Sequence, residues 1–208
     1  MGIKSYDDMN LIELDVIKEI GSIGTGNAAT ALSGLLSKEV KMTLPSVSIQ
    51  GYNDSINTLG NPEEIVAAVL VRMSGEMNGL MLFILKLDFI NVVIEELLKE
   101  KVDDYSQLSV IEISALEEIG NIVISSYISA MSKLTDVSIN LTVPEIAVNM
   151  LGGILSVPMV EFGYETDKLM MIEGTFIVDG NELKSNLLMM PDIESLNFLM
   201  KQLGVNNG

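Results

Sequence analysis

Two stretches of the chain share one pattern, and they decide the fold that the sequence predicts. Residues 15–32 read DVIKEIGSIGTGNAATAL, and residues 114–122 read SALEEIGNI. Both contain Glu-Ile-Gly, then a Ser or Asn, then Ile, and they begin 99 positions apart. Two similar segments at a fixed separation indicate that the chain holds two copies of one structural unit.

The two copies stay in register beyond these stretches. A shift of 99 residues superimposes the identical pairs Glu13/Glu112, Glu19/Glu118, Ile20/Ile119, Gly21/Gly120, Ile23/Ile122, Ala31/Ala130, Ser33/Ser132, Leu35/Leu134, Thr43/Thr142 and Pro45/Pro144. We therefore expect an internal duplication, with half-repeats at about residues 10–100 and 107–204. Because a half of this size leaves a short sheet with uncovered edges, we expect the halves to fuse into one pseudo-twofold α+β domain over residues 1–208.

The apolar periodicity predicts the same core order in each half: a long helix, a strand, a β-hairpin and a short helix. In the first half we expect a helix at 11–37, a strand at 39–50, a loop at 51–63, a hairpin of 64–73 and 79–87, and a helix at 89–99 capped by Asp88. After a polar connector at 101–106, the second half should hold a helix at 107–134, strands at 136–144, 157–164, 168–178 and 184–190, and a helix at 193–203 capped by Asp192. A further short helix at 145–154 has no expected counterpart in the first half.

The composition excludes several kinds of site. The chain has 208 residues with no Cys and no His, so a disulfide framework, a zinc finger, a thiol nucleophile and a His-based triad are all excluded. Its net charge of −17 repels nucleic acid and anionic lipid. No apolar run approaches the roughly 18 residues of a spanning helix, and no secretory signal is visible. We therefore expect a cytoplasmic protein without membrane insertion or nucleic-acid binding.

After Glu19 and Glu118, one face of each long helix carries small polar residues where an ordinary solvent face would carry long charged ones. At about 100° per residue, this outer stripe contains Ser114, Glu118, Asn121, Ser125, Ser129 and Ser132 in the second helix, and Asp15, Glu19, Ser22, Gly26, Thr30 and Ser33 in the first. The opposite face of the second helix should form core through Leu116, Val123, Tyr127 and Leu134. Small side chains allow the surface of another protein to approach closely.

Glu118 and Asn121 are i,i+3 neighbours and point the same way. An amide both donates and accepts hydrogen bonds, so Asn121 can orient a water molecule toward an already activated electrophile such as an aspartyl phosphate. Glu118 can pair with a cationic group of a partner. From the residues alone, a second interpretation stays open, in which both are solvated residues of an amphipathic helix.

The two stretches resemble the two copies of the [D/S]-x-x-x-E-x-x-N signature of the CheC/CheX/FliY phosphatases. Further similarity lies at residues 61–66, 75–82 and 188–191, so that the resemblance covers nearly the whole chain. CheX-like members carry one site, and FliY-like members add a flagellar-switch domain that this length does not hold. Two motif copies therefore fit the CheC type best.

The resemblance implies a chemotaxis phosphatase that hydrolyses the aspartyl phosphate of a CheY-like response regulator and binds the receptor deamidase CheD. In the family the Asn orients the attacking water and the Glu pairs with a Lys of the regulator. On that basis Glu118 and Asn121 are the expected catalytic residues, with Ser114 as the first residue of their motif. The resemblance implies no intrinsic cofactor, because the Mg²⁺ of the reaction belongs to the regulator.

The first copy departs from the signature at Ser22, which stands where the family has Asn. Asp15 and Glu19 match, but a Ser hydroxyl is shorter than a carboxamide and has a single donor. We therefore expect the first helix to carry a weak or degenerate site. The alternative function is a non-catalytic adaptor that sequesters CheD or the phosphorylated regulator.

Two other segments have more than one interpretation. Gly21, Gly24 and Gly26 lack the order and the preceding strand of a nucleotide loop, so close helix packing or room for a partner is favoured. The apolar segment 145–154 is interpreted either as buried or as a docking surface for a partner such as CheD.

Overall fold

The computed structural model describes residues 2–104, 107–162 and 167–205. Its centre is an eight-stranded antiparallel sheet made of β1 (Val40–Met42), β2 (Ser46–Gly51), β3 (Ile65–Gly75), β4 (Gly79–Leu85), β5 (Ile139–Leu141), β6 (Glu145–Met150), β7 (Lys168–Val178) and β8 (Asn181–Pro191). The helices are α1 (Leu11–Leu36), α2 (Tyr52–Leu59), α3 (Leu87–Leu98), α4 (Val110–Thr135), α5 (Leu151–Phe162) and α6 (Ile193–Gln202), with a 3₁₀ turn η1 (Tyr6–Asp8). The chain therefore has the predicted α+β class.

The order of elements is the same on both sides of the connector between α3 and α4. Each half runs long helix, two short strands, helix, hairpin and helix. The halves exchange strands: β1 and β2 pair with β7 of the second half, whereas β5 and β6 pair with β3 of the first half. The two hairpins meet where β4 pairs with β8. Neither half therefore completes its own part of the sheet.

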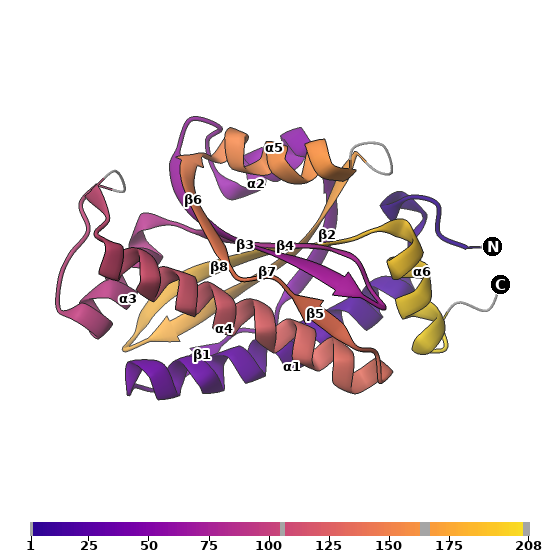
Figure 1. The fold of residues 1–208 in the computed structure, drawn as a ribbon, viewed down its shortest axis with the longest axis horizontal. Coiled ribbons are helices and arrows are strands. Elements are labelled where there is room, and N and C mark those ends of the chain that lie inside the picture. The colour runs from indigo at the N-terminus through magenta and orange to yellow at the C-terminus, as the bar shows by residue number, and fades with distance from the viewer. Residues whose placement is uncertain (1, 105–106, 163–166, 206–208) are drawn as a thin grey trace.

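The sheet separates two layers of helices (Figure 1). The long helices α1 and α4 lie side by side across one face and run in opposite directions, as their colours along the chain show. The shorter helices α2 and α5 lie together on the other side of the molecule, and α6 lies near the two termini. Every residue of β4 is buried, as expected for a strand in the middle of the sheet.

Each long helix begins with the same reciprocal cap. Asn10 accepts hydrogen bonds from the backbone of Ile12 and Glu13, and the Glu13 carboxylate accepts one from the Asn10 backbone. Ser109 and Glu112 make the same exchange at the start of α4. Such capping boxes fix where a helix begins. They also explain why the acidic residues repeated at positions 13 and 112 are buried.

Several predicted boundaries were wrong. The expected loop 51–63 contains α2, and the expected strand 39–50 is two strands, β1 and β2. The expected strand 136–144 is reduced to β5. Helix α3 begins after Lys86, so the predicted cap Asp88 lies inside the first turn, while Asp192 does cap α6. Polar α2 was missed because it buries few apolar side chains.

The segment 145–154 was also wrongly predicted. Residues 145–150 form β6, which pairs with residues 65–70 of β3, and α5 begins only at Leu151. The predicted strand 157–164 is helical up to Phe162, and its remaining residues lie outside the described ranges. Because β6 and α5 follow β5 as β2 and α2 follow β1, this segment is not an insertion unique to the second half. Pairing with a distant strand has overridden its local pattern.

Candidate active site

The outer face of α4 presents the predicted pair. Glu118 and Ser114 are exposed and Asn121 is half-buried. The Ser125 hydroxyl lies 3.2 Å from Asn121 Oδ1 and donates to it, one turn further along the helix. Among the described residues no protein group accepts from the Asn121 amide nitrogen. A side chain tethered at its oxygen in this way keeps both N–H donors for a water molecule or a partner.

The outer face of α1 repeats the arrangement with a shorter side chain. Asp15 and Glu19 are exposed, and Ser22 is half-buried like Asn121. Within the described ranges the Ser22 hydroxyl makes no hydrogen bond. The first helix thus offers the same exposed acid but no amide, as the sequence indicated.

The two helices are in close contact at Gly24 of α1 and Tyr127 of α4. A Cβ added to Gly24 would lie 2.8 Å from Tyr127 Cα, and the Thr25 and Tyr127 hydroxyls are 2.7 Å apart. Burial raises the pKa of the Tyr127 phenol, and the hydrogen bond with Thr25 acts in the opposite direction. This contact confirms close helix packing for Gly24, whereas Gly21 lies against Pro45 and Ile172 and Gly26 faces open space.

This crossing separates the two predicted sites. Asn121 precedes Tyr127 on α4, and Ser22 precedes Gly24 on α1. Because the helices run in opposite directions (Figure 1), the two pairs lie on opposite sides of the Gly24–Tyr127 contact. The structure therefore places Glu118 beside Asn121, and Glu19 beside Ser22, but the two pairs lie apart.

A shallow groove of about 360 Å³ follows the outer seam between the helices. Its lining residues are Asn27, Ala31, Ile122, Ser125, Ser126, Ser129 and Lys133. Most are small, so a partner can approach the helix backbones there, and Ser125 connects the groove directly to Asn121. Neither this groove nor the Ser125 tether was anticipated as part of the site, although the i,i+4 spacing of residues 121 and 125 was a usable signal.

The predicted core face of α4 is confirmed except at its end. Leu116, Val123 and Tyr127 are buried, whereas Leu134 is 43% exposed. Among residues 2–104, 107–162 and 167–205, no three acidic residues gather as a metal site would require. None of the helices in those ranges is both long and apolar enough to cross a bilayer.

Comparison with known proteins finds a family match over the two segments that contain these residues. A model described as the CheC-like family matches residues 12–49 and 111–148. The CheY-P phosphatase CheC of Bacillus subtilis (strain 168) is 30% identical over 198 residues, which cover 93% of this chain and 95% of that protein. The flagellar motor switch phosphatase FliY of the same organism is 29% identical over 146 residues, covering 69% of this chain and 38% of FliY.

The fold is also similar to solved structures. The crystal structure of Thermotoga maritima FliY matches with a TM-score of 0.74 at 21% identity, over 95% of this chain and 98% of that one. The middle domain of FliM from H. pylori matches with a TM-score of 0.71 at 15% identity, over 93% and 99% of the two chains. These matches establish a shared fold.

Proposed function

The chain belongs to the CheC-like family, and we propose that it hydrolyses the aspartyl phosphate of a CheY-like response regulator at Glu118 and Asn121. The observation that carries the proposal is the exposed Glu118 beside an Asn121 amide whose oxygen is tethered by Ser125. The near full-length relative is itself a CheY-P phosphatase. The finer assignment of residues rests on the geometry of α4.

In the proposed reaction Asn121 orients a water molecule for in-line attack on the phosphorus of the regulator's aspartyl phosphate. The P–O bond to the aspartate breaks, and the products are inorganic phosphate and a free carboxylate. Such a reaction depends on positioning more than on strong base catalysis, so an amide held on a rigid helix suffices. The Mg²⁺ of the reaction belongs to the regulator in this proposal.

Glu118 would fix the register of the complex by pairing with a cationic group of the regulator. It lies one helical turn from Asn121 and is exposed, so it can reach a partner without rearrangement. The groove of small residues between α1 and α4 would receive the surface next to that contact. Ser114 would contribute at the edge of the same stripe.

We propose that Asp15, Glu19 and Ser22 form a degenerate copy of this site. Its acids are exposed as in the second copy, but Ser22 lacks the amide. The two segments matched by the family model are 99 residues apart, and the same order of elements follows each of them. Both facts support an origin of the two halves by internal duplication.

CheD binding is a separate part of the proposal, and β6 is the candidate surface. Val148 and Met150 on this strand are 39% and 50% exposed. They line an apolar groove of about 590 Å³ with Ile65 and Ile146. An exposed apolar groove at a sheet edge suits a protein partner. If the alternative adaptor function holds, this surface would be sufficient without catalysis.

The decisive experiment follows the decay of a phosphorylated CheY-like regulator with the unmodified protein and with variants, each with and without CheD. Asn121→Ala should remove acceleration of order 10²–10⁴-fold, because a group that positions a water contributes about that much. Ser22→Ala is the matched control and should behave as the unmodified protein. Glu118→Gln should raise the regulator concentration needed for half-maximal rate.

The outcomes separate the two functions. Absence of acceleration by the unmodified protein in both arms would leave only the adaptor function. Full activity of Asn121→Ala together with loss in Ser22→Ala would assign the reaction to α1 instead. Retained circular dichroism in Asn121→Ala shows that a lost activity is not lost folding, since Asn121 contributes no core volume.

A further inference from the structure

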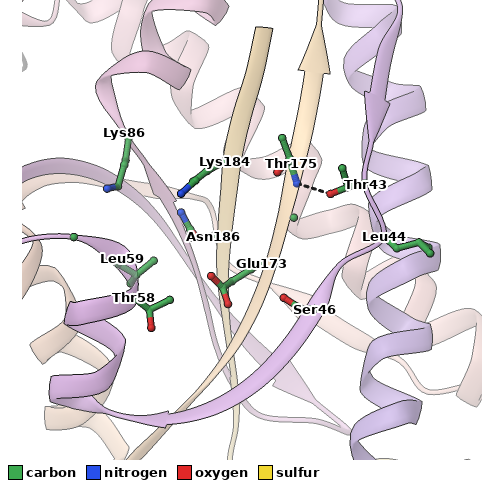
Figure 2. A pocket seen from close by; sticks show the side chains of 12 residues that line it. Thr43, Leu44, Ser46, Thr58, Leu59, Lys86, Glu173, Thr175, Lys184 and Asn186 are labelled. Carbon is green, nitrogen blue, oxygen red and sulfur yellow. Dashed lines mark hydrogen bonds between the residues drawn. The ribbon is translucent and has the colours of Figure 1, made fainter. Parts of the chain in front are cut away.

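A third pocket, of about 470 Å³, lies away from the long helices and is lined mainly by polar side chains (Figure 2). Its floor is formed by β7 and β8, and its walls by the end of α2 and the segment between β1 and β2. The proposed phosphatase reaction uses none of its residues.

The pocket lies on the sheet face turned away from α1. Ile172 of β7 faces α1, since a Cβ on Gly21 would lie 3.6 Å from it. Successive side chains of a strand alternate between faces, so Glu173 points to the other side. Asn186 of β8 is directly opposite Glu173 in an unbroken antiparallel ladder and shares its face. The pocket is therefore separated from the candidate active site by the thickness of the sheet.

Asn186 is the residue that indicates a ligand. It is only 6% exposed, and it lines the pocket. Its amide makes no hydrogen bond with any residue in the described part of the chain. Buried amides are normally hydrogen-bonded to protein or to ordered water. An unsatisfied one that opens into a cavity is available to donate to and accept from an occupant.

The charged side chains that line the pocket form no ion pair across it. Glu173 and Lys184 lie diagonally across the β7–β8 ladder, a distance that long side chains can span. In the described ranges they nevertheless form no ion pair with each other or with another residue. Figure 2 shows Lys86 and Lys184 in one part of the pocket and Glu173 in another, beside Thr58 and Ser46.

Lys86 is held in place at the rim. Its ammonium group is 3.3 Å from Glu64. Gly60, with a φ of +152°, leaves the space that this carboxylate occupies, because a Cβ there would collide with Glu64. The pocket thus combines one anchored and one unpaired ammonium group, a free amide, and one unpaired carboxylate.

We propose that this pocket binds a free α-amino acid. The ligand carboxylate would lie between Lys184 and Lys86 and accept from the Asn186 amide, while its ammonium group would pair with Glu173. A zwitterion joins the opposite charges that the pocket holds apart. With an uncharged side chain it also carries no net charge, so the overall charge of −17 does not repel it as it would repel a free anion.

The test measures binding of alanine, serine, glutamate and lysine to the unmodified protein by calorimetry and by NMR chemical-shift changes. Each amino acid is compared with its N-acetyl derivative, which lacks the ammonium group, and with its methyl ester, which lacks the carboxylate. At least one free amino acid should bind, and both of its blocked forms should bind about 10- to 100-fold more weakly. Binding of the N-acetyl form as strong as that of the free acid would overturn the proposal.

Variants locate the site. Lys184→Gln and Glu173→Gln should each weaken binding about 10- to 100-fold. Lys201→Gln and Glu194→Gln change the same charges on α6, outside the pocket lining, and should have no effect. Equal weakening by pocket and control variants, or no binding of any of the four amino acids, would refute the site. Neither result depends on the phosphatase activity.

Discussion

Ser22 and Asn121 occupy equivalent half-buried positions, one turn after an exposed Glu on each long helix. The two proposed sites differ at this side chain, and they differ also where Asp15 stands opposite Ser114 and Gly26 opposite the tethering Ser125. Ser22→Asn should raise the dephosphorylation rate, because it restores an amide on a helix that already supplies Glu19. If the two sites act independently and at equal rates, the substitution would raise the total dephosphorylation rate by at most about a factor of two.

The informative background for this substitution is Asn121→Ala, in which the second site is silent. There Ser22→Asn should recover a measurable part of the lost rate in the regulator decay assay. Ser22→Gln in the same background is the matched control, since it carries the same amide on a longer side chain. No recovery with Asn would show that α1 lacks more than the amide.

We predict that Tyr127 makes the free energy of unfolding depend on pH in the alkaline range. Because burial raises its pKa in the folded protein, the folded state keeps the phenol proton above pH ~10, where an unfolded tyrosine loses it. The folded state then binds more protons than the unfolded one, so the free energy of unfolding falls as pH rises through the folded pKa. Urea unfolding from neutral to alkaline pH should show this fall, and Tyr127→Phe should flatten it.

The same Tyr127→Phe variant should lose about 1 kcal/mol at neutral pH, since the hydrogen bond with Thr25 is removed. An unchanged alkaline slope in Tyr127→Phe would mean that another group causes the pH dependence.

At the scale of elements, the contact of α1 with α4 depends on Gly24. An added Cβ would meet the Tyr127 backbone and ring, so Gly24→Ala must push the helices apart. We expect a loss of about 1–3 kcal/mol in the free energy of unfolding, as for other overpacked interiors. Gly26→Ala is the matched control on the same helix, because its Cβ would enter open space.

Gly26→Ala should instead stabilise the protein by about 0.5–1 kcal/mol, as Ala is favoured over Gly inside a helix. Urea unfolding midpoints of the two variants measure the contrast. A Gly24→Ala protein as stable as the unmodified one would show that the helices are not held at this distance.

The whole molecule carries 29 acidic and 12 basic residues. The excess negative charges repel one another most strongly in the compact folded state. Salt screens that repulsion, since the Debye length falls from about 30 Å at 0.01 M to about 3 Å at 1 M. The urea midpoint should therefore rise with NaCl concentration over this range. Sucrose, which carries no charge, serves as the control for excluded-solute effects, and a midpoint that falls with salt would contradict the prediction.

At the same scale, the pairing of strands was the part of the fold that local patterns left undetermined. The sequence predicted the long helices, the hairpin of β3 and β4, and the strands β7 and β8, because their periodicity and caps are local. It did not predict that β6 is a strand. Residues 145–150 become one by pairing with β3, which lies about 80 positions away in the chain.

The sequence by itself determined the repeat, the absence of Cys and His chemistry, and the stripe that holds Glu118 and Asn121, because each follows from composition or from helical spacing. Only the tertiary structure decided what surrounds these residues. It placed the two proposed sites on opposite sides of the Gly24–Tyr127 crossing, and it brought Lys86, Glu173 and Lys184 into one pocket. Contacts between residues distant in the chain depend on strand register and helix crossing, which no local pattern specifies.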